Sequence, residues 1–587
     1  MEKSRIGVYV CWCGTNIAKM VDVENVAEEM GKLPNVVIAK NYKYMCSDPG
    51  QDLIVKDIKE HNLNRVVVAA CSPRIHELTF RKALQKAGIN PYLFEMANIR
   101  EQDSWVHTDR GEATKKAKAL IAAAINRVNF HEPLDERTVD INPSTLVIGG
   151  GIAGISAALE IADSGKTVFL VERTNKLGGN TANVDLTFPY MLSAQQMLLP
   201  LIKRVQNNKN IQLFLETDIK EIYGYVGNFE TTITPKNGKE TKLNFGNIIV
   251  ATGLKAFEAK KVANYGYGSL PNVITSSEFE KMALSGKIIK NDGSEPKNIA
   301  IIHCVGSRNK DYHEYCSRTC CMTALKYANQ LRSALPKSNI FELYADMRAM
   351  GKGCEELYSE TSKRKVMFLM FDQQNDLPKI RKAKSGEGSD LIIEMNEKLS
   401  GETVEVPADM VILMTGMEAH DNAKDIAHAV GISLCGNAFY IEKHPKLDPV
   451  ATTTNGVYIV GSCQGPKDIS DSICQARAAA ARILGTIAKG SVSVEVTTAW
   501  VNEDICCGCQ TCIKVCPYTA ISFNEEKKVS VVNEILCKGC GTCGSACPTG
   551  AIRSRHFTDQ QIISQIEGIM SMSLSLEFDK KLQEVNQ

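Results

Sequence analysis

The sequence predicts an α/β protein of three parts: an N-terminal α/β domain, a larger α/β domain in the middle and a small C-terminal α+β domain. Three observations support this division. Apolar runs with the length of buried strands end at cysteines in the first part and at glycines in the middle part. Nine of the 21 cysteines crowd into residues 506–547. We expect domain boundaries at residues 1–140, 141–490 and 497–587.

Composition excludes several classes of protein. Of the 587 residues, 44% are hydrophobic and 23% are charged, which is the balance of an ordinary folded protein. The 68 basic and 67 acidic residues nearly cancel, which argues against a nucleic-acid-binding protein. No apolar run approaches the roughly 18 residues of a membrane-spanning helix, and the first residues lack the apolar core of a signal peptide. We therefore expect a cytoplasmic enzyme or enzyme subunit with no direct membrane insertion.

The cysteine spacing of the C-terminal part is the most specific motif in the chain. With the extra Cys507 left out, residues 506–517 read C-x2-C-x2-C-x3-C-P, and residues 537–548 repeat this spacing. It is the pattern of two-cluster ferredoxins, in which the fourth cysteine of each run binds the other cluster. A zinc site would use two C-x2-C pairs instead. We expect one 4Fe–4S cluster on Cys506, Cys509, Cys512 and Cys547 and a second on Cys537, Cys540, Cys543 and Cys516.

The middle part begins with a strand, a glycine turn and a helix. Residues 145–151 read TLVIGGG, residues 149–154 fit G-x-G-x-x-G, and the next strand ends at Glu172. Such glycines admit a pyrophosphate to the helix N-terminus, and the acid accepts hydrogen bonds from ribose hydroxyls. We therefore expect a dinucleotide cofactor in this part. Its contacts are expected at Gly149, Gly151, Ile152, Ala153, Gly154, Glu172, Arg173, Gly178, Gly179 and Asn180.

Later elements favour FAD as this cofactor. NIIVATG (247–253) and DMVILMTGM (409–417) are strand patterns ending at glycine, and GVYIVGSCQGPKDI (456–469) opens onto an Ala-rich helix. Over residues 141–490 the chain resembles two-dinucleotide flavoproteins of the thioredoxin reductase type, in which the last element closes over the flavin ring. That resemblance implies further flavin contacts at Ala251, Thr252, Gly253, Gly461, Ser462, Asp468 and Ile469. It also implies a second dinucleotide subdomain at about 256–404. Its glycine turn is degenerate, because Cys304 stands at the first glycine position.

Cys304 belongs to a group of cysteines without a standard spacing. The others are Cys316, Cys320 and Cys321, so that four thiols fall within a short segment. Two interpretations remain open from the residues alone. The group is either a further 4Fe–4S site or a set of buried free thiols of the kind that protein cores often contain.

The N-terminal part holds four more cysteines after strand-like runs. Cys11, Cys13, Cys46 and Cys71 are each expected at the carboxyl end of a parallel strand, and such ends meet at one sheet edge. This convergence fits a further cluster site. The competing interpretation is a catalytic thiol at Cys71, because the following SPRIHE segment brings Arg74 and His76 near it.

These motifs together identify a family. The chain closely resembles the iron–sulfur flavoprotein of CoB–CoM heterodisulfide reductase, its A-type subunit (the HdrA family), over essentially its whole length. The shared motifs are VCWCG, YKYMCSDPGQ, ACSPRIHE, EMANIREQDSWVH, HCVGSR, YCSRTCC, GSCQGPKDI and the two ferredoxin runs. The resemblance implies that both irregular cysteine groups hold clusters. It also implies that Lys467 lies near flavin N5 as the catalytic residue that tunes the flavin.

The chain departs from longer members of that family in one segment. Those members carry a ferredoxin module inserted in the flavin domain. Here residues 226–245 read VGNFETTITPKNGKETKLNF and contain no cysteine, which indicates a plain hairpin-like connection. We therefore expect a variant without the inserted module, whose partners need not all match those of the longer members.

The resemblance implies an FAD and iron–sulfur electron-transfer subunit of a heterodisulfide-reductase-like complex, with flavin-based electron bifurcation. The implied partners are disulfide-reductase subunits of the B and C type, a donor such as a hydrogenase, formate dehydrogenase or NADH-oxidising subunit, and ferredoxin. They would form a hetero-oligomer that can dimerise through this subunit. Two alternatives remain open: a non-bifurcating oxidoreductase subunit that feeds a membrane or sulfur-metabolism partner, and a scaffold with structural clusters.

Overall fold

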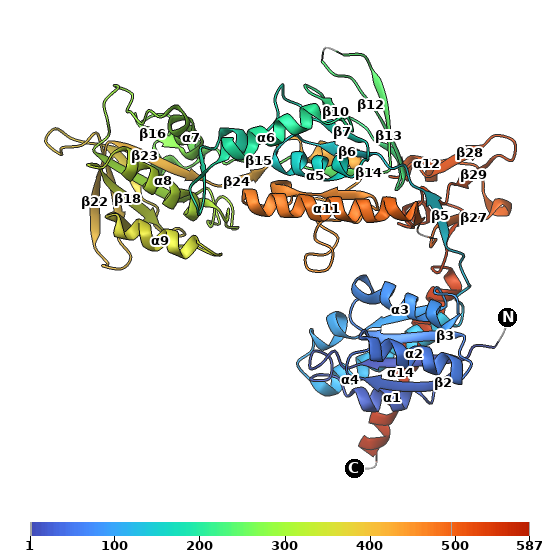
Figure 1. The fold of residues 1–587 in the computed structure, drawn as a ribbon. Helices are drawn as coiled ribbons and strands as arrows, with labels where there is room; N and C mark the ends of the chain where they lie inside the picture. Colours follow the sequence, from blue (N-terminus) through green and yellow to red (C-terminus); the bar gives the residue numbers. More distant parts are fainter. Residues whose placement is uncertain (1–2, 237, 495, 586–587) are drawn as a thin grey trace. The chain divides into compact units, whose positions relative to one another are not determined.

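A computed structural model describes residues 3–236, 238–494 and 496–585, with side chains up to residue 572. The chain divides into two compact units (Figure 1). One unit combines residues 1–138 with residues 493–587, and the other comprises residues 139–492. The predicted N-terminal and C-terminal domains therefore share one unit, and the predicted middle domain forms the other.

The N-terminal domain is a parallel sheet covered by helices on both faces. Alternate residues of β1 and β3 pack on opposite faces, against α1 and α4 on one side and against α2 and α3 on the other. Such two-sided burial explains the continuous apolar runs of these strands. The sheet has the order β2-β1-β3-β4 and is built from β1 (Ile6–Cys11), α1 (Val23–Met30), β2 (Val36–Tyr42), α2 (Asp48–Glu60), β3 (Arg65–Ala70), α3 (Pro73–Ala87), β4 (Phe94–Asn98), a π-helical turn η1 (Arg100–Ser104) and α4 (Arg110–Val128).

The C-terminal domain has an internally repeated layout. Each copy of the cysteine run spans one of two short helices, with its third cysteine in the helix, and two antiparallel strand pairs flank them. Its elements are β27 (Ala499–Val501), α12 (Thr511–Val515), β28 (Ile521–Asn524), β29 (Val529–Val532), α13 (Thr542–Ser545) and β30 (Ile552–Ser554). A final helix, α14 (Asp559–Val585), returns to α4, where a Cβ at Gly568 would lie 2.7 Å from the carbonyl oxygen of Ala122. This close approach ties the C-terminal segment to the N-terminal domain.

The first half of the larger unit is a five-stranded parallel sheet in the order β10-β7-β6-β14-β25. A three-stranded antiparallel sheet of β11, β12 and β13 accompanies it, and the hairpin-like connection expected at 226–245 is confirmed by the pairing of β12 with β13. The elements are β6 (Thr145–Ile148), α5 (Ile152–Asp163), β7 (Val168–Val171), α6 (Ala194–Asn207), β10 (Ile211–Phe214), β11 (Tyr223–Tyr225), β12 (Asn228–Ile233), β13 (Thr241–Phe245), β14 (Asn247–Val250), α10 (Ala423–Val430), β25 (Val457–Ile459) and α11 (Ile469–Lys489).

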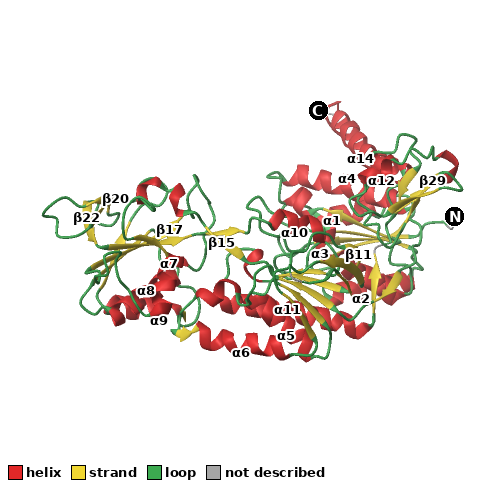
Figure 2. Ribbon diagram, turned by 90° about the horizontal axis from the view of Figure 1, so that it is seen from above, coloured by secondary structure: helices red, strands yellow, loops and turns green. Residues whose placement is uncertain are grey.

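The second half repeats this plan with a sheet in the order β16-β23-β17-β18-β19. Two short strands, β15 (Leu254–Ala256) and β24 (Met417–Ala419), pair and join the halves, and Figure 2 shows β15 at the junction. The other elements are β16 (Val273–Thr275), α7 (Ser276–Ser285), β17 (Asn298–Val305), α8 (Cys320–Ala334), β18 (Asn339–Tyr344), α9 (Cys354–Lys363), β19 (Val366–Met370), β20 (Lys379–Lys382), β21 (Leu391–Asn396), β22 (Thr403–Ala408) and β23 (Met410–Thr415).

The predicted end of this subdomain at about residue 404 is too early. β23 is completely buried and lies between β16 and β17, so the second sheet extends to Thr415. The DMVILMTGM segment resembles NIIVATG because both are buried parallel strands that end at a glycine. That pattern does not indicate to which of two similar sheets a strand belongs. Within the part of the chain that the structure describes, no helix has both the length and the apolar character needed to cross a membrane.

Candidate flavin and iron–sulfur sites

Two glycine turns lie face to face at the start of α5. The amide of Gly178 donates to the carbonyl of Gly150 at 2.8 Å, and a Cβ at Gly179 would come within 3.0 Å of the Gly151 Cα. A Cβ at Gly151 would meet nothing closer than 3.9 Å. The space in front of the helix N-terminus is therefore open, which fits a pyrophosphate group.

Glu172 is held at the end of β7 by hydrogen bonds from the backbone. One carboxylate oxygen accepts from the amide of Gly150 at 2.7 Å, and the other accepts from the amide and hydroxyl of Thr174, both at 2.8 Å. A carboxylate has about four acceptor positions, so one remains for a ribose hydroxyl. The side chain is oriented for this contact before any ligand binds, since three bonds fix it.

The remaining predicted flavin contacts lie on neighbouring elements of the same half. Thr252 contacts the hydroxyl of Tyr440 at 3.4 Å, and Asn180 donates to the carbonyl of Leu254 at 3.1 Å. The guanidinium of Arg173 contacts the ring of His420. Tyr440 and His420 carried no motif, so sequence reasoning did not single them out.

The late glycine turn lies where β25 leads to α11. Gly461 donates its amide to the side chain of Gln475 at 2.7 Å, and Asp468 caps α11 by accepting from the amide of Asp471 at 2.7 Å. Lys467 precedes this cap and is half-buried; burial lowers its pKa. Ser462 and Ile469 are the other predicted contacts on these elements, so the turn and the start of the helix carry all five residues of this group.

The second half places Cys304, Cys316, Cys320 and Cys321 between the end of β17 and the start of α8. Cys304 ends the apolar part of β17 in a left-handed conformation (φ 57°), and Cys320 and Cys321 begin α8. Burial raises the pKa of Cys304 to about 12, and the neighbouring Cys321 and Cys316 add to that shift. These thiols therefore lie close together at a helix N-terminus, whose dipole favours the negative charge of bound thiolates. A cluster bound by these four thiols stays a prediction.

A buried pair of ionisable side chains lies next to this cysteine group, in contact with Cys321. His303 and Glu342 are fully buried on the adjacent strands β17 and β18, with Nε2 and Oε2 separated by 3.0 Å. Burial lowers the pKa of His303, but its contacts with Cys321 and Glu342 outweigh burial and raise the pKa to about 9. Sequence reasoning missed both residues, although a polar residue within the apolar NIAIIHCV strand is a signal that could have found them.

The four N-terminal cysteines also converge at one edge of their sheet. The amides of Cys13 and Met45 donate to the sulfur of Cys11 at 3.3 and 3.5 Å, and the thiols of Cys11, Cys13 and Cys46 influence one another electrostatically. Cys71 is influenced by Cys13 and Cys11 in the same way.

The environment of Cys71 disfavours the competing interpretation as a catalytic thiol. Burial raises the pKa of Cys71 to about 12, so a free thiol here would be protonated and weakly nucleophilic. Metal binding removes that proton, which suits four converging cysteines. Arg100, which sequence reasoning did not single out, donates from Nη1 to the sulfur of Cys13 at 3.1 Å.

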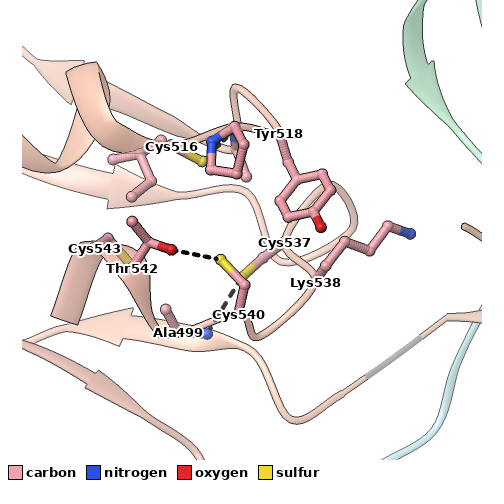
Figure 3. Close-up of a pocket in the computed structure, with 12 residues that line it drawn as sticks. Ala499, Cys516, Tyr518, Cys537, Lys538, Cys540, Thr542 and Cys543 are labelled. Atoms are coloured by element: carbon pink, nitrogen blue, oxygen red, sulfur yellow. Dashed lines mark hydrogen bonds between the residues drawn. The ribbon is translucent and has the colours of Figure 1, made fainter. Parts of the chain in front are cut away.

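One predicted ferredoxin set surrounds a pocket in the C-terminal domain (Figure 3). Cys516, Cys537, Cys540 and Cys543 line it together with Ala499 and Tyr518. Backbone amides face two of these sulfurs: Ala499 donates to Cys537 at 3.4 Å and Ala520 to Cys516 at 3.3 Å. Such amide-to-sulfur bonds are typical of iron–sulfur sites.

The other ferredoxin set consists of three cysteines from the first run and Cys547 from the second. Cys512 is buried on α12, Cys506 and Cys547 are half-buried, and Cys509 is exposed. Gly508 and Gly539 occupy equivalent positions of the two runs with φ of 69° and 62°, and a Cβ at either would lie within 2.6 Å of a backbone carbonyl oxygen. Glycine is therefore required at this position of both loops.

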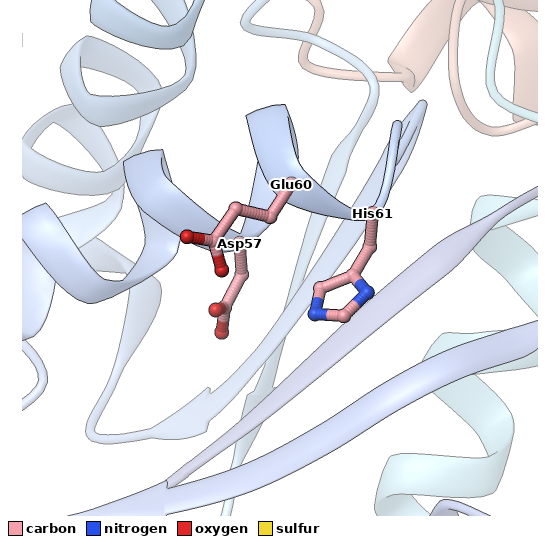
Figure 4. Close-up of side chains that lie close together, drawn as sticks. All are labelled: Asp57, Glu60 and His61. Atoms are coloured by element: carbon pink, nitrogen blue, oxygen red, sulfur yellow. The ribbon is translucent and has the colours of Figure 1, made fainter.

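Three further side chains with metal-binding atoms lie close together on α2 and just after it (Figure 4). They are Asp57, Glu60 and His61. Asp57 already pairs with Lys40 at 2.8 Å and accepts from the hydroxyl of Tyr9 at 3.3 Å. This carboxylate is satisfied by its own domain, and we assign no metal to the group.

Comparisons with known proteins identify two domains and a family. The family described as pyridine nucleotide-disulphide oxidoreductase matches residues 143–302, and the 4Fe-4S dicluster domain matches residues 499–554. The chain is 40% identical, over 97% of its length and 98% of the relative, to the A-type subunit of the H(2):CoB-CoM heterodisulfide,ferredoxin reductase of Methanothermobacter marburgensis. It is 41% identical, over 97% of its length and 99% of the relative, to the second A-type iron-sulfur subunit of the CoB--CoM heterodisulfide reductase of Methanopyrus kandleri.

A similar solved structure is the thioredoxin reductase of T. acidophilum, with 16% identity, a TM-score of 0.40 and coverage of 59% of this chain and 99% of that one. The alignment to the Methanothermobacter relative spans 658 positions, which exceeds the 587 residues of this chain. That relative therefore has residues without a counterpart here, in agreement with a shorter variant.

Proposed function

Because this chain belongs to the family of A-type heterodisulfide reductase subunits, we propose that it divides electrons between separate cluster branches that meet at one flavin site. The chain is an oxidoreductase subunit that binds FAD and 4Fe–4S clusters. FAD supplies the chemistry that joins two-electron and one-electron carriers, and clusters carry single electrons. Flavin-based electron bifurcation is the function that this combination supports best.

One observation carries the proposal. The thiols of the 304–321 group occupy the turn of the second half where a nicotinamide nucleotide would otherwise bind, and they adjoin the first half. Arg318, from the same loop, pairs with Asp471 in the first turn of α11 at 2.6 Å, and its charge acts on Lys467. A one-electron carrier at this place would exchange electrons with the flavin site where a nicotinamide would exchange a hydride.

The residues that would hold each group follow from the geometry. The glycine turns and Glu172 would bind the pyrophosphate and ribose of FAD, and Lys467 at the start of α11 would place a cation beside the flavin ring. The two ferredoxin sets would bind the clusters of one electron-transfer branch. The cysteine groups at 11–71 and 304–321 would bind the clusters of the other branches.

Partner subunits would complete the reaction. We propose B-type and C-type disulfide-reductase subunits, ferredoxin, and a donor subunit of the hydrogenase, formate dehydrogenase or NADH-oxidising kind, assembled as a hetero-oligomer. Residues 141–490 contain no C-x-x-C pair. Disulfide reduction therefore belongs to a partner, and this chain supplies the flavin and the clusters that carry single electrons.

Cluster content tests the assignment of the cysteine groups. The anaerobically purified chain is expected to hold about sixteen irons, as four clusters, and about one FAD. Cys320→Ala is expected to lower the iron content by about four per chain because it removes a ligand of one cluster. Iron, acid-labile sulfide and flavin assays measure this. Cys474→Ala, at an exposed cysteine outside all four sets, is the control and should retain native iron. Native iron in Cys320→Ala would contradict a cluster at 304–321.

The coupling of the two branches tests bifurcation itself. In the complex purified with its partner subunits, each donor pair should send one electron to each branch. Ferredoxin and the disulfide acceptor should therefore be reduced in equal electron amounts. Ferredoxin reduction should also stop when the disulfide is withheld. The measurement is the absorbance change of ferredoxin together with thiol release. Ferredoxin reduction that continues without disulfide would favour the non-bifurcating alternative.

A further inference from the structure

Arg100 lies among the N-terminal cysteines rather than on the protein surface. It follows β4, in the π-helical turn η1, and its side chain is 15% exposed. Its Nη1 donates to the sulfur of Cys13 at 3.1 Å. The guanidinium also lies near enough to Cys71 and Cys46 to act on both thiols electrostatically. One guanidinium therefore acts on three of the four thiols.

Contacts with Glu101 and Trp105 fix the guanidinium in this position. Its Nε and Nη2 donate to one oxygen of Glu101 at 3.2 and 2.7 Å. The other oxygen of Glu101 accepts from the amide of Ser72, next to Cys71, at 2.9 Å. The guanidinium also lies over the ring of Trp105 at 4.9 Å. With Nε and Nη2 taken by Glu101, Nη1 is directed at the thiols.

We propose that Arg100 is a positioning residue that raises the reduction potential of a cluster held by Cys11, Cys13, Cys46 and Cys71. The inference rests on the proposed function, which assigns a cluster to these cysteines. An added electron makes the cluster more negative, so a fixed cation and an N–H···S bond stabilise the reduced state more than the oxidised state. The half-buried setting strengthens this effect because solvent screens it less.

Glu101 limits how far Arg100 raises the reduction potential. Its carboxylate offsets part of the charge of Arg100 while holding the Nη1 donor in place. The removal of Arg100 and the removal of the Glu101 charge should therefore shift the potential in opposite directions. This opposition distinguishes an electrostatic role from a merely structural one.

The test uses the full chain with native clusters and a redox titration followed by electron paramagnetic resonance. The signal that disappears in Cys46→Ser identifies the N-terminal cluster. Arg100→Gln should shift its midpoint to lower potential, Arg100→Lys should shift it less, and the other clusters should not move. Glu101→Gln should shift the same midpoint upward.

Arg81→Gln is the matched control. Arg81 is 17% exposed, pairs with Glu77 at 2.6 Å and lies over the ring of Tyr92 at 4.3 Å in the same domain. Like Arg100, it contacts a carboxylate and an aromatic ring, but among the described residues it donates no hydrogen bond to a thiol. Its removal should leave every midpoint unchanged, while preserving the iron content.

An unchanged midpoint in Arg100→Gln with native iron would overturn the inference. If Arg100→Gln loses the cluster, Glu101→Gln decides: an upward shift supports the inference and an unchanged midpoint overturns it. Failure of the proposed function looks different. In that case the native chain holds about twelve irons, and Cys46→Ser removes no signal.

Discussion

Replacing Lys326 with methionine is expected to lower the free energy of unfolding of the larger unit by about 3–5 kcal/mol. Lys326 is 2% exposed on α8 and pairs with Glu280 of α7. Glu280 also accepts from the hydroxyl of Tyr327 at 2.9 Å and from the amide of Asp185 at 3.0 Å. Removing the cation would leave a buried carboxylate without its counter-charge, which costs more than the pair itself contributes.

The same pair connects the two halves of this unit. Lys326 donates to the carbonyl of Leu186 at 2.9 Å, in the segment that follows the Gly178–Gly179 turn. FAD release should therefore occur at a lower temperature in Lys326→Met, and flavin fluorescence during heating measures this shift. Lys242→Met is the control, because its pair with Glu230 at 2.7 Å is exposed and should contribute less than about 1 kcal/mol. Equal effects of the two substitutions would contradict the prediction.

Gly151→Ala is expected to reduce FAD affinity at least tenfold, or about 1.4 kcal/mol, without unfolding the chain. Gly151 has φ of −76°, which alanine adopts freely, and a Cβ there meets nothing closer than 3.9 Å. The added methyl would stand at the N-terminus of α5, where the backbone must approach the pyrophosphate closely. Flavin content after purification and titration of the flavin-free protein with FAD measure the loss.

Two further glycines make this prediction specific. Gly485→Ala in α11 has open space around it and should leave FAD binding and stability near native. Gly154→Ala should lose both, because a Cβ there would lie 1.8 Å from the carbonyl oxygen of Gly149 and force α5 away from the turn. If Gly151→Ala binds FAD with native affinity, the pyrophosphate does not lie where the glycine turns predict.

Local patterns predicted much of the fold. The strand, glycine turn and helix at 145–163 is a contiguous unit, so its geometry follows from neighbouring residues. The parallel strands before Cys11 and Cys71 were likewise readable as buried apolar runs. The placement of β23 was not readable, since two sheets of one chain accept the same strand pattern and only packing decides between them.

The residues around the sites were less accessible to sequence reasoning than the ligands themselves. Arg100 lies 87 positions from Cys13, and Glu342 lies 39 positions from His303. Neither pair forms a motif, because each contact depends on how strands align in a sheet. The burial of Cys71, which raises the pKa of its thiol, likewise depends on tertiary packing that the sequence does not record.

The motifs of the chain are enough to indicate which chemistry it can hold. The ferredoxin spacing and the dinucleotide fingerprint are set within a few residues, at the scale where a loop must wrap a cluster or a phosphate. Which charges face those groups follows from the packed fold, because long-range packing brings Arg100 to Cys13 and Arg318 to Asp471. Reduction potentials depend on such charges and on burial. The direction of electron flow is therefore a property of the packed fold rather than of the motifs.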